Sequence, residues 1–504
     1  MISRVCLLCF ASIFFHSLCF ALSIIDNASL TLNMDTYFRT DLVGFKNVVD
    51  LDSANKDDST TYLGIDYSLG FNAQFKDADT QCYLKLERNG PYDYSAPLFV
   101  HNTLMTSGGA IEKYRNTELL PQLEEFWVDA ALPKDFRFKI GLYAYEVGNA
   151  FSLNGGYENY GFTLSRQWGN ALWRFYYCRP EIAYKNHLGP RIRQDEEQGI
   201  RYNHNASNFF STDIKFNREN VSIQPYIGAL VDYTSQGKRD NLFSAPVERD
   251  ILGTGGIAWN GHKDNLSITL EMAHNFGQAK STDPNYKDVY HTGYLFFSDV
   301  DYRMGKFKPS FEFLLCSGNK VTPEMAQNQD ATLTSGKNRA FSYYSPLNIN
   351  HLDSISSNNS AARPLVAMGS GNGLNYGVPR PGTFGSTDFD NLIMPSLLLD
   401  FTPTDKLSLG LSFYYLMSFA RGVGTLNGEG KYLSRELGYE LDFILDYQLN
   451  PKTLISICAG RFLPGRYYKE ERDDASGSLF SPFLRGDGKA DSAYQFEISV
   501  EINF

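Results

Sequence analysis

The sequence lacks the long apolar runs that build membrane-spanning helices. Beyond its first residues it contains no stretch of about 18 apolar residues, so no transmembrane helix is predicted. It also lacks an excess of basic residues, because 46 Lys and Arg stand against 57 Asp and Glu and the formal net charge is −11. Nucleic-acid binding requires a basic surface. The composition therefore excludes nucleic acid as a partner.

Cysteines are few and no two of them form a CxxC pair, so the sequence predicts neither a metal site nor a disulfide framework. The cysteines beyond the first 21 residues are Cys82, Cys178, Cys316 and Cys458. The HExxH and GxSxG motifs of hydrolases are absent, and the eight histidines are scattered along the chain. We therefore predict no catalytic residues, no metal and no cofactor, and we do not expect an enzyme.

The N-terminus has the pattern of a secretory signal. A short basic start, Met1 to Arg4, precedes a nearly unbroken apolar run from Val5 to Phe15. Cys19-Phe20-Ala21 then places small residues at the −3 and −1 positions of a cleavage site. We predict a signal peptide over residues 1–21 and a single domain over residues 22–504.

Aromatic residues are abundant although the chain is hydrophilic on average. The sequence has 32 Tyr and 37 Phe, and the mean hydropathy is −0.31. A barrel wall in a membrane needs this mixture, because half of its strand residues meet lipid, half meet water, and aromatic girdles mark both interfaces. Without an apolar helix, a closed β-barrel is the structure that can cross lipid.

The last residues alternate between apolar and polar without a fault. The apolar members are Tyr494, Phe496, Ile498, Val500, Ile502 and Phe504. Alternation of period two predicts a strand with one apolar and one polar face. A final aromatic residue resembles the terminal signal of outer-membrane barrels, so we expect the barrel assembly machinery to bind this strand, which ends at Phe504.

Eight pairs of alternating segments surround short polar turns, as in β-hairpins. The turns are predicted near Asp77, Pro133, Gly169, Glu219, His262, Gly305, Pro403 and Pro451. With a lone first strand at Leu30–Met34 and the terminal strand, the total is about 18 strands, an even number as single-chain bacterial barrels require. We predict an all-β fold, a transmembrane antiparallel β-barrel in the outer membrane. Long external loops are expected over 89–123, 179–208, 317–391 and 463–492.

A barrel of this size encloses a backbone cylinder roughly 35 Å across, which side chains cannot fill. Alternation assigns to the lumen the cations Arg39, Lys85, Arg137, Lys139, Arg174, Lys215, Arg303 and Lys308. Acids outnumber these bases on the same face and are densest at Glu436, Glu440, Asp442 and Asp446. Rings of like charge select the opposite ion, so a uniform lumen of this kind favours cations.

The hairpin Glu436–Asn450, followed by Phe462 to Gly465, resembles the closing region of alginate-export-type outer-membrane porins. The shared pattern is a Gly-x-Glu-x-Asp strand, a turn, and a strand that ends in an aromatic-x-Pro-Gly motif. Residues 136–165 resemble a second, less specific segment of that family. The resemblance implies an 18-stranded barrel that exports an anionic polysaccharide. A family arginine corresponds to Leu142 here, which puts that substrate in doubt.

These observations leave several functions open. The leading hypothesis is a passive channel that exports an anionic, alginate-like exopolysaccharide past basic residues gathered in the N-terminal half of the chain. The alternative is a general or substrate-specific uptake porin for small solutes. A plugged structural barrel and an outer-membrane enzyme are weaker hypotheses. All of these readings place the chain in the lipid bilayer of the outer membrane.

Overall fold

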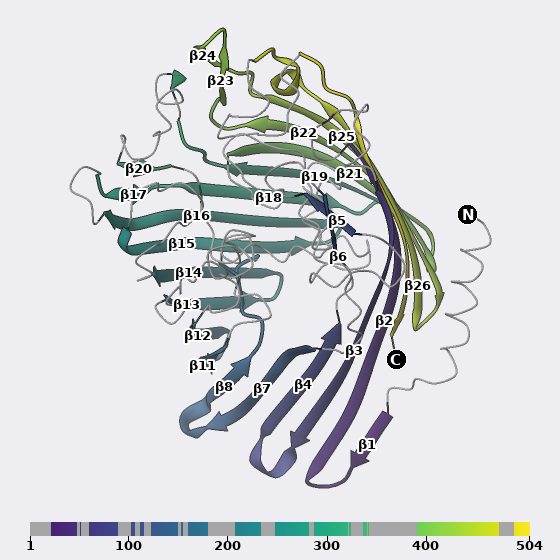
Figure 1. Cartoon of the computed structure of the whole chain (residues 1–504). Coiled ribbons are helices and arrows are strands. Elements are labelled where there is room, and N and C mark those ends of the chain that lie inside the picture. Colours follow the sequence, from purple (N-terminus) through teal and green to yellow (C-terminus); the bar gives the residue numbers. More distant parts are fainter. Residues whose placement is uncertain are drawn as a thin grey trace.

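The structure is a computed structural model that describes residues 22–47, 51, 60–88, 102–105, 111–114, 122–149, 153–154, 160–179, 207–232, 247–281, 287–320, 322–323, 336–339, 341, 391–472 and 488–503. These residues form one closed antiparallel β-barrel (Figure 1). The predicted signal peptide, Phe504 and most of the loops predicted over 89–123, 179–208 and 317–391 lie outside the described residues.

Eighteen strands make the ring, and each pairs antiparallel with both of its neighbours. They are β2 (Leu30–Lys46), β3 (Thr60–Phe75), β4 (Thr80–Arg88), β7 (Gln122–Leu132), β8 (Phe136–Leu142), β11 (Tyr160–Trp168), β12 (Ala171–Arg179), β13 (Ser207–Arg218), β14 (Val221–Asp232), β15 (Val247–Lys263), β16 (Leu266–Ser281), β18 (Tyr294–Tyr302), β19 (Phe307–Cys316), β21 (Leu392–Thr404), β22 (Leu407–Ser418), β25 (Glu436–Asn450), β26 (Thr453–Pro464) and β27 (Ala493–Asn503). The ring closes where β27 pairs with β2, from Tyr37↔Asn503 to Lys46↔Tyr494.

The predicted fold class and strand count are confirmed. Two predicted turns were misplaced by a few residues, because β15 continues through Lys263 and β21 continues through Thr404. The first turn then falls at Asp264, which has a φ of +52°, a conformation that short polar side chains tolerate. All eight short turns lie at one end of the barrel, which we call the short-turn end. The opposite end is the long-loop end.

Further short strands lie outside the eighteen strands of the ring. β1 (Leu22–Asp26) pairs with the first residues of β2, and β17 (Val289–His291) connects β16 to β20 (Lys337–Asn338). Three further pairs lie outside the main sheet: β5 (Asn102–Met105) with β6 (Ile111–Tyr114), β9 (Glu146–Val147) with β10 (Leu153–Asn154), and β23 (Val423–Leu426) with β24 (Glu429–Tyr432). The short 3-10 segments are η1 (Lys76–Ala78), η3 (Pro133–Asp135) and η6 (Arg466–Lys469).

The outer face of the ring is apolar and exposed. Phe126, Ile140, Ile227, Leu397 and Leu441 are between 48% and 59% exposed, although each sits in the middle of a regular strand. A continuous belt of large exposed apolar side chains around a closed barrel is the surface that faces lipid. The protein is therefore a multi-pass β-barrel of the outer membrane. Among the described residues, no helix is long and apolar enough to span a membrane.

Two glycines break the alternation near the long-loop end. Gly141 and Gly438 have φ angles of +141° and +142°, and a Cβ at either position would lie 2.1 or 2.2 Å from a carbonyl oxygen of the neighbouring strand. Only glycine adopts this backbone without a clash. Leu142 and Leu437 therefore leave the lipid face to which strict alternation would assign them, and they are 2% and 0% exposed.

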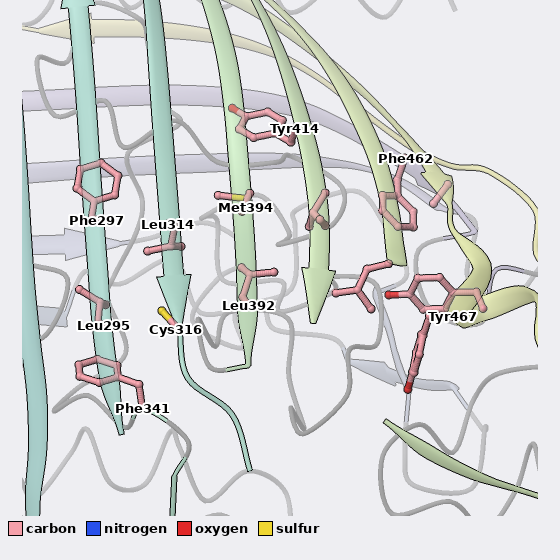
Figure 2. Close-up of a cluster of buried hydrophobic side chains, with 14 of the residues drawn as sticks. Leu295, Phe297, Leu314, Cys316, Phe341, Leu392, Met394, Tyr414, Phe462 and Tyr467 are labelled. Atoms are coloured by element: carbon pink, nitrogen blue, oxygen red, sulfur yellow. The ribbon is translucent and has the colours of Figure 1, made fainter. Parts of the chain in front are cut away.

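The inner face carries two apolar clusters rather than a uniformly polar surface. The larger cluster spans neighbouring strands from β16 to β27 and includes Phe297, Leu314, Met394 and Tyr414 (Figure 2). Residues from outside the ring strands, Phe341, Leu433, Tyr467 and Tyr468, pack on it. The smaller cluster lines β12 to β14 and is described below. Cys82, Cys178, Cys316 and Cys458 are free thiols.

Candidate permeation pathway

A chain segment lies along the inner face of the barrel wall immediately after β8, over the neighbouring strands β11 to β16. It consists of residues 143–149, which we call the inward segment, and includes β9. Tyr143, Tyr145 and Val147 are between 0% and 4% exposed and belong to the smaller apolar cluster. The ring of Tyr145 stacks on that of Tyr176, with centroids 3.9 Å apart and planes at 7°. Because Tyr176 lies on the inner face of β12, the segment occupies space inside the barrel.

The far end of the inward segment is anchored on β15 and β16. The backbone N–H of Asn149 donates to the Glu271 carboxylate at 2.7 Å, and the Asn149 side chain donates to the carbonyl of Leu270 at 3.2 Å. The hydroxyl of Tyr226 donates to the same carboxylate at 2.7 Å. Glu271 is fully buried, so hydrogen bonds to its charged form stabilise this attachment. The segment therefore extends from β8 across to β16.

Gly148 makes this attachment possible. Its φ is +66°, and a Cβ there would lie 3.1 Å from both the Glu271 carboxylate and the Tyr226 ring. A larger residue would have to displace the groups that hold Asn149.

The middle of the inward segment is held by an ion pair on the wall. Asp213 of β13 is buried, and its side chain receives the Arg174 guanidinium through Nε at 3.1 Å and Nη2 at 3.2 Å. The Tyr145 hydroxyl donates to the same carboxylate at 2.9 Å, and Gln224 donates at 2.9 Å. Burial raises the pKa of the Tyr145 hydroxyl well above its usual range, so this group remains a neutral donor. Arg174 also donates to the Glu146 carbonyl at 3.1 Å.

The other predicted cations of the N-terminal half lie on the inner face, and three of them, Arg39, Lys85 and Arg137, are paired with acids. Arg137 bonds Asp129 at 3.0 Å and Asp79 at 3.2 Å, and Lys85 pairs with Glu87. Neighbouring opposite charges on a sheet neutralise one another in this way. The expected basic wall is therefore a mixture of both signs.

Lys139 and Lys215 are the exceptions on this wall, and the contacts of Lys139 are with aromatic rings. Its ammonium lies 3.8 Å from the centroid of the Trp127 ring and 4.3 Å from that of Tyr143. No carboxylate among the described residues lies within 4 Å of it. A cation held over aromatic faces keeps its positive charge available to the lumen.

Arg39 lies at the closure of the barrel rather than on an open lumen surface. It is 3% exposed, and it bonds Asp41 and Glu497 at 2.6 Å each. Glu497 belongs to β27, so this ion pair links the first and last strands of the ring. Its geometry indicates a structural role in closure.

The strands from β18 to β27 carry the densest acids, as predicted. Their inward-facing carboxylates are Asp299, Asp301, Glu312, Asp400, Glu440, Asp442, Asp446, Glu497 and Glu501, which we call the acidic wall. Within these strands, all of them described, Lys308 is the only lysine or arginine on the inner face. It pairs with Asp400 at 3.2 Å and with Asp301 at 3.7 Å.

Exposure divides the acidic wall into two parts. Asp301 and Asp400 keep 21% and 20% of their side chains exposed toward the short-turn end. Glu440, Asp442 and Asp446 are between 1% and 3% exposed. The Ser456 hydroxyl donates to Asp446 at 2.6 Å. The buried members thus contribute to wall structure, and the exposed members border the lumen.

Two of the predicted lumen residues lie elsewhere. Arg303 is exposed in the turn after β18, beyond the end of the strand. Glu436 precedes the Gly438 bulge and pairs with the exposed Arg466 at 3.4 Å. Arg303 departs from strict alternation because β18 ends before it, and Glu436 departs from it because of the bulge at Gly438. Among the described residues, no group of three or more His, Cys, Asp or Glu side chains is placed to hold a metal ion.

The inward segment was not anticipated from the sequence. Its aromatic residues Tyr143 and Tyr145 are out of phase with the apolar residues Phe138, Ile140 and Leu142 that alternate along β8. The two glycines at positions 141 and 148 are the signal that distinguishes it, because isolated glycines in a strand pattern indicate a bulge or a close approach. A buried pair of Asp250 and His291, 2.8 Å apart, was also missed.

No protein-family model matches the sequence, and no curated protein matches it. Among solved structures, the chain is similar to the outer membrane protein OprD of Pseudomonas aeruginosa, with 9% identity, a TM-score of 0.48, and coverage of 96% of this chain and 95% of that chain. OpdQ of the same organism shows 8% identity, a TM-score of 0.48, and coverage of 94% and 98%. OccAB2 of Acinetobacter baumannii shows 8% identity, a TM-score of 0.48, and coverage of 96% and 99%.

Proposed function

We propose that this protein is an outer-membrane channel through which small hydrophilic solutes diffuse passively, with a preference for cations. The observation that carries the proposal is the inward segment. It is anchored through Tyr145 on Asp213 and through Asn149 on Glu271, so it narrows a barrel that is otherwise wide. A narrowed, charged lumen selects solutes by size and charge.

Charge supports the preference for cations. The exposed carboxylates Asp301 and Asp400 share one lysine, Lys308, so this part of the lumen has a net negative charge. On the opposite wall, Lys139 and Lys215 are the predicted lumen cations that have no carboxylate within 4 Å among the described residues. A path bordered mainly by acids and by paired charges attracts cations and repels anions.

Export of an anionic polysaccharide is the competing proposal. The similarity of Glu436–Asn450 to alginate-export-type porins favours it. Two features oppose it: Arg39, Lys85, Arg137 and Arg174 are paired with acids, and the inward segment occupies space that a polymer would need. We therefore prefer the small-solute channel, with uptake by diffusion.

The test is conductance of the refolded mature protein in a planar bilayer. We expect open channels, a reversal potential in a KCl gradient that indicates cation selectivity, and no block by polyuronate. Anion selectivity together with block by polyuronate would establish the export function instead. Absence of any conductance would show a plugged barrel and would overturn both proposals.

A further inference from the structure

A groove of about 580 Å³ opens on the outer wall of the barrel at the closing seam. It lies over β25, β26, β27 and β2, where Phe443 faces Ala459, Ala459 faces Phe496, and Phe496 faces Gly44 on successive strands. Ala459 has a small side chain and leaves a depression between the Phe443 and Phe496 rings, and Gly44 leaves open space on the far side of Phe496. The volume is in the range of small-molecule sites.

Two cations lie at the end of this groove that is nearer the long-loop end of the barrel. Lys46 and Arg461 are the direct cross-strand neighbours of Tyr494, one on each side. The Arg461 guanidinium lies 5.3 Å from the centre of the Tyr494 ring and donates to the Ser492 hydroxyl at 3.4 Å. Both cations are exposed, and within the described part of the chain neither has a carboxylate within 4 Å.

The position of Lys46, Arg461 and Tyr494 along the barrel wall indicates which part of the membrane they contact. Tyr494 lies near the long-loop end of β27, on the lipid face, and is 39% exposed. Exposed tyrosines at strand ends mark the level of lipid headgroups. Cations without acidic partners at that level attract the negative charge of lipid phosphates. An apolar groove directly below them continues into the level of the acyl chains.

We infer that this groove is a binding site for a phosphate-bearing membrane lipid. The phosphate would lie between Lys46 and Arg461, and one acyl chain would fill the depression over Ala459 between Phe443 and Phe496. A second copy of the barrel fits less well, because a symmetric contact through this patch would bring Lys46 and Arg461 against their own copies. The site is separate from the lumen and independent of the solute that the channel carries.

The test is native mass spectrometry of the full mature chain in detergent, titrated with dimyristoyl phosphatidylglycerol or with dimyristoyl phosphatidylcholine. The two lipids have the same acyl chains and differ in net headgroup charge. We expect tighter binding of phosphatidylglycerol. The double variant K46Q/R461Q should weaken its binding by about tenfold or more, because each cation at a membrane surface contributes to attraction of anionic lipid. Ala459→Phe should weaken the binding of both lipids by filling the groove.

The matched control is R249Q/K280Q. Arg249 and Lys280 are exposed and lie next to one another across β15 and β16, so this variant removes the same charge from a different wall. It should bind phosphatidylglycerol as the wild type does. Equal binding of the two lipids by the wild type, or an equal loss in the control, would overturn the inference. A dimer that disappears in K46Q/R461Q with lipid binding unchanged would show a second copy as the occupant.

Discussion

The two halves of the inner wall hold their buried charges in different ways. From β8 to β16, Asp213 and Glu271 bind a chain segment that lies along the inner face of the wall. From β18 to β27, acids such as Glu440 and Asp442 are buried beside an apolar cluster, onto which Phe341, Leu433 and Tyr467 also pack. A barrel this wide cannot be filled by wall side chains alone. In each half, residues outside the ring strands fill part of the interior, through polar anchors in the first half and through apolar packing in the second.

The largest effect is expected from Asp213→Asn in the first half. The change removes the buried negative charge that pairs with Arg174 and leaves one acceptor oxygen for Tyr145, Arg174 and Gln224, which weakens the anchor of the inward segment. Breaking a buried ion pair on one side costs on the order of 3 kcal/mol of unfolding free energy. Because the central anchor of the inward segment is weakened, single-channel conductance should also rise. Urea unfolding in micelles and bilayer recordings measure the two effects.

The control for this variant is Asp79→Asn. Asp79 also pairs with an arginine, Arg137, at 3.2 Å, but 68% of its side chain is exposed. An exposed pair contributes about 0–1 kcal/mol, so stability and conductance should stay near those of the wild type. Equal losses in the two variants would contradict the anchoring role of Asp213.

A smaller effect is expected from Lys308→Gln in the second half. The variant leaves Asp301 and Asp400 without their shared cation. Since all three side chains are partly exposed, the unfolding free energy should fall by only about 1 kcal/mol. The uncompensated acids should increase cation selectivity, which the reversal potential in a salt gradient reports. A shift toward anions would show that these acids do not border the conducting path.

The sequence was sufficient to predict the ring, because alternation and turn residues are local properties of each hairpin. All eighteen strands correspond to predicted segments, and the inward-facing acids follow from the same alternation. It was insufficient where the backbone leaves that pattern. At Gly141 and Gly438 the φ angles of +141° and +142° redirect the following or preceding leucine inward, and neither change alters the composition of the strand.

The partners of the lumen charges were also beyond the sequence. Alternation places Arg39 inside, but its contact with Glu497 joins residues at opposite ends of the chain. The path of the inward segment depends on tertiary contacts of Asn149 with Glu271, which no local pattern encodes. The faces of the strands were thus predictable, whereas the pairing of charges and the path of the inward segment were not.

The smallest effect is expected from Lys139→Gln, which tests whether the first half offers any free positive charge. Lys139 lies 3.8 Å from the centre of the Trp127 ring, an interaction of about 0.5–1 kcal/mol. Removing it should lower stability by that amount and increase cation selectivity slightly. A double-mutant cycle with Trp127→Leu isolates the contact, and the coupling energy should account for most of the loss. Zero coupling, with selectivity unchanged, would show that Lys139 neither binds the ring nor reaches the conducting path, and the two halves would then differ in packing alone.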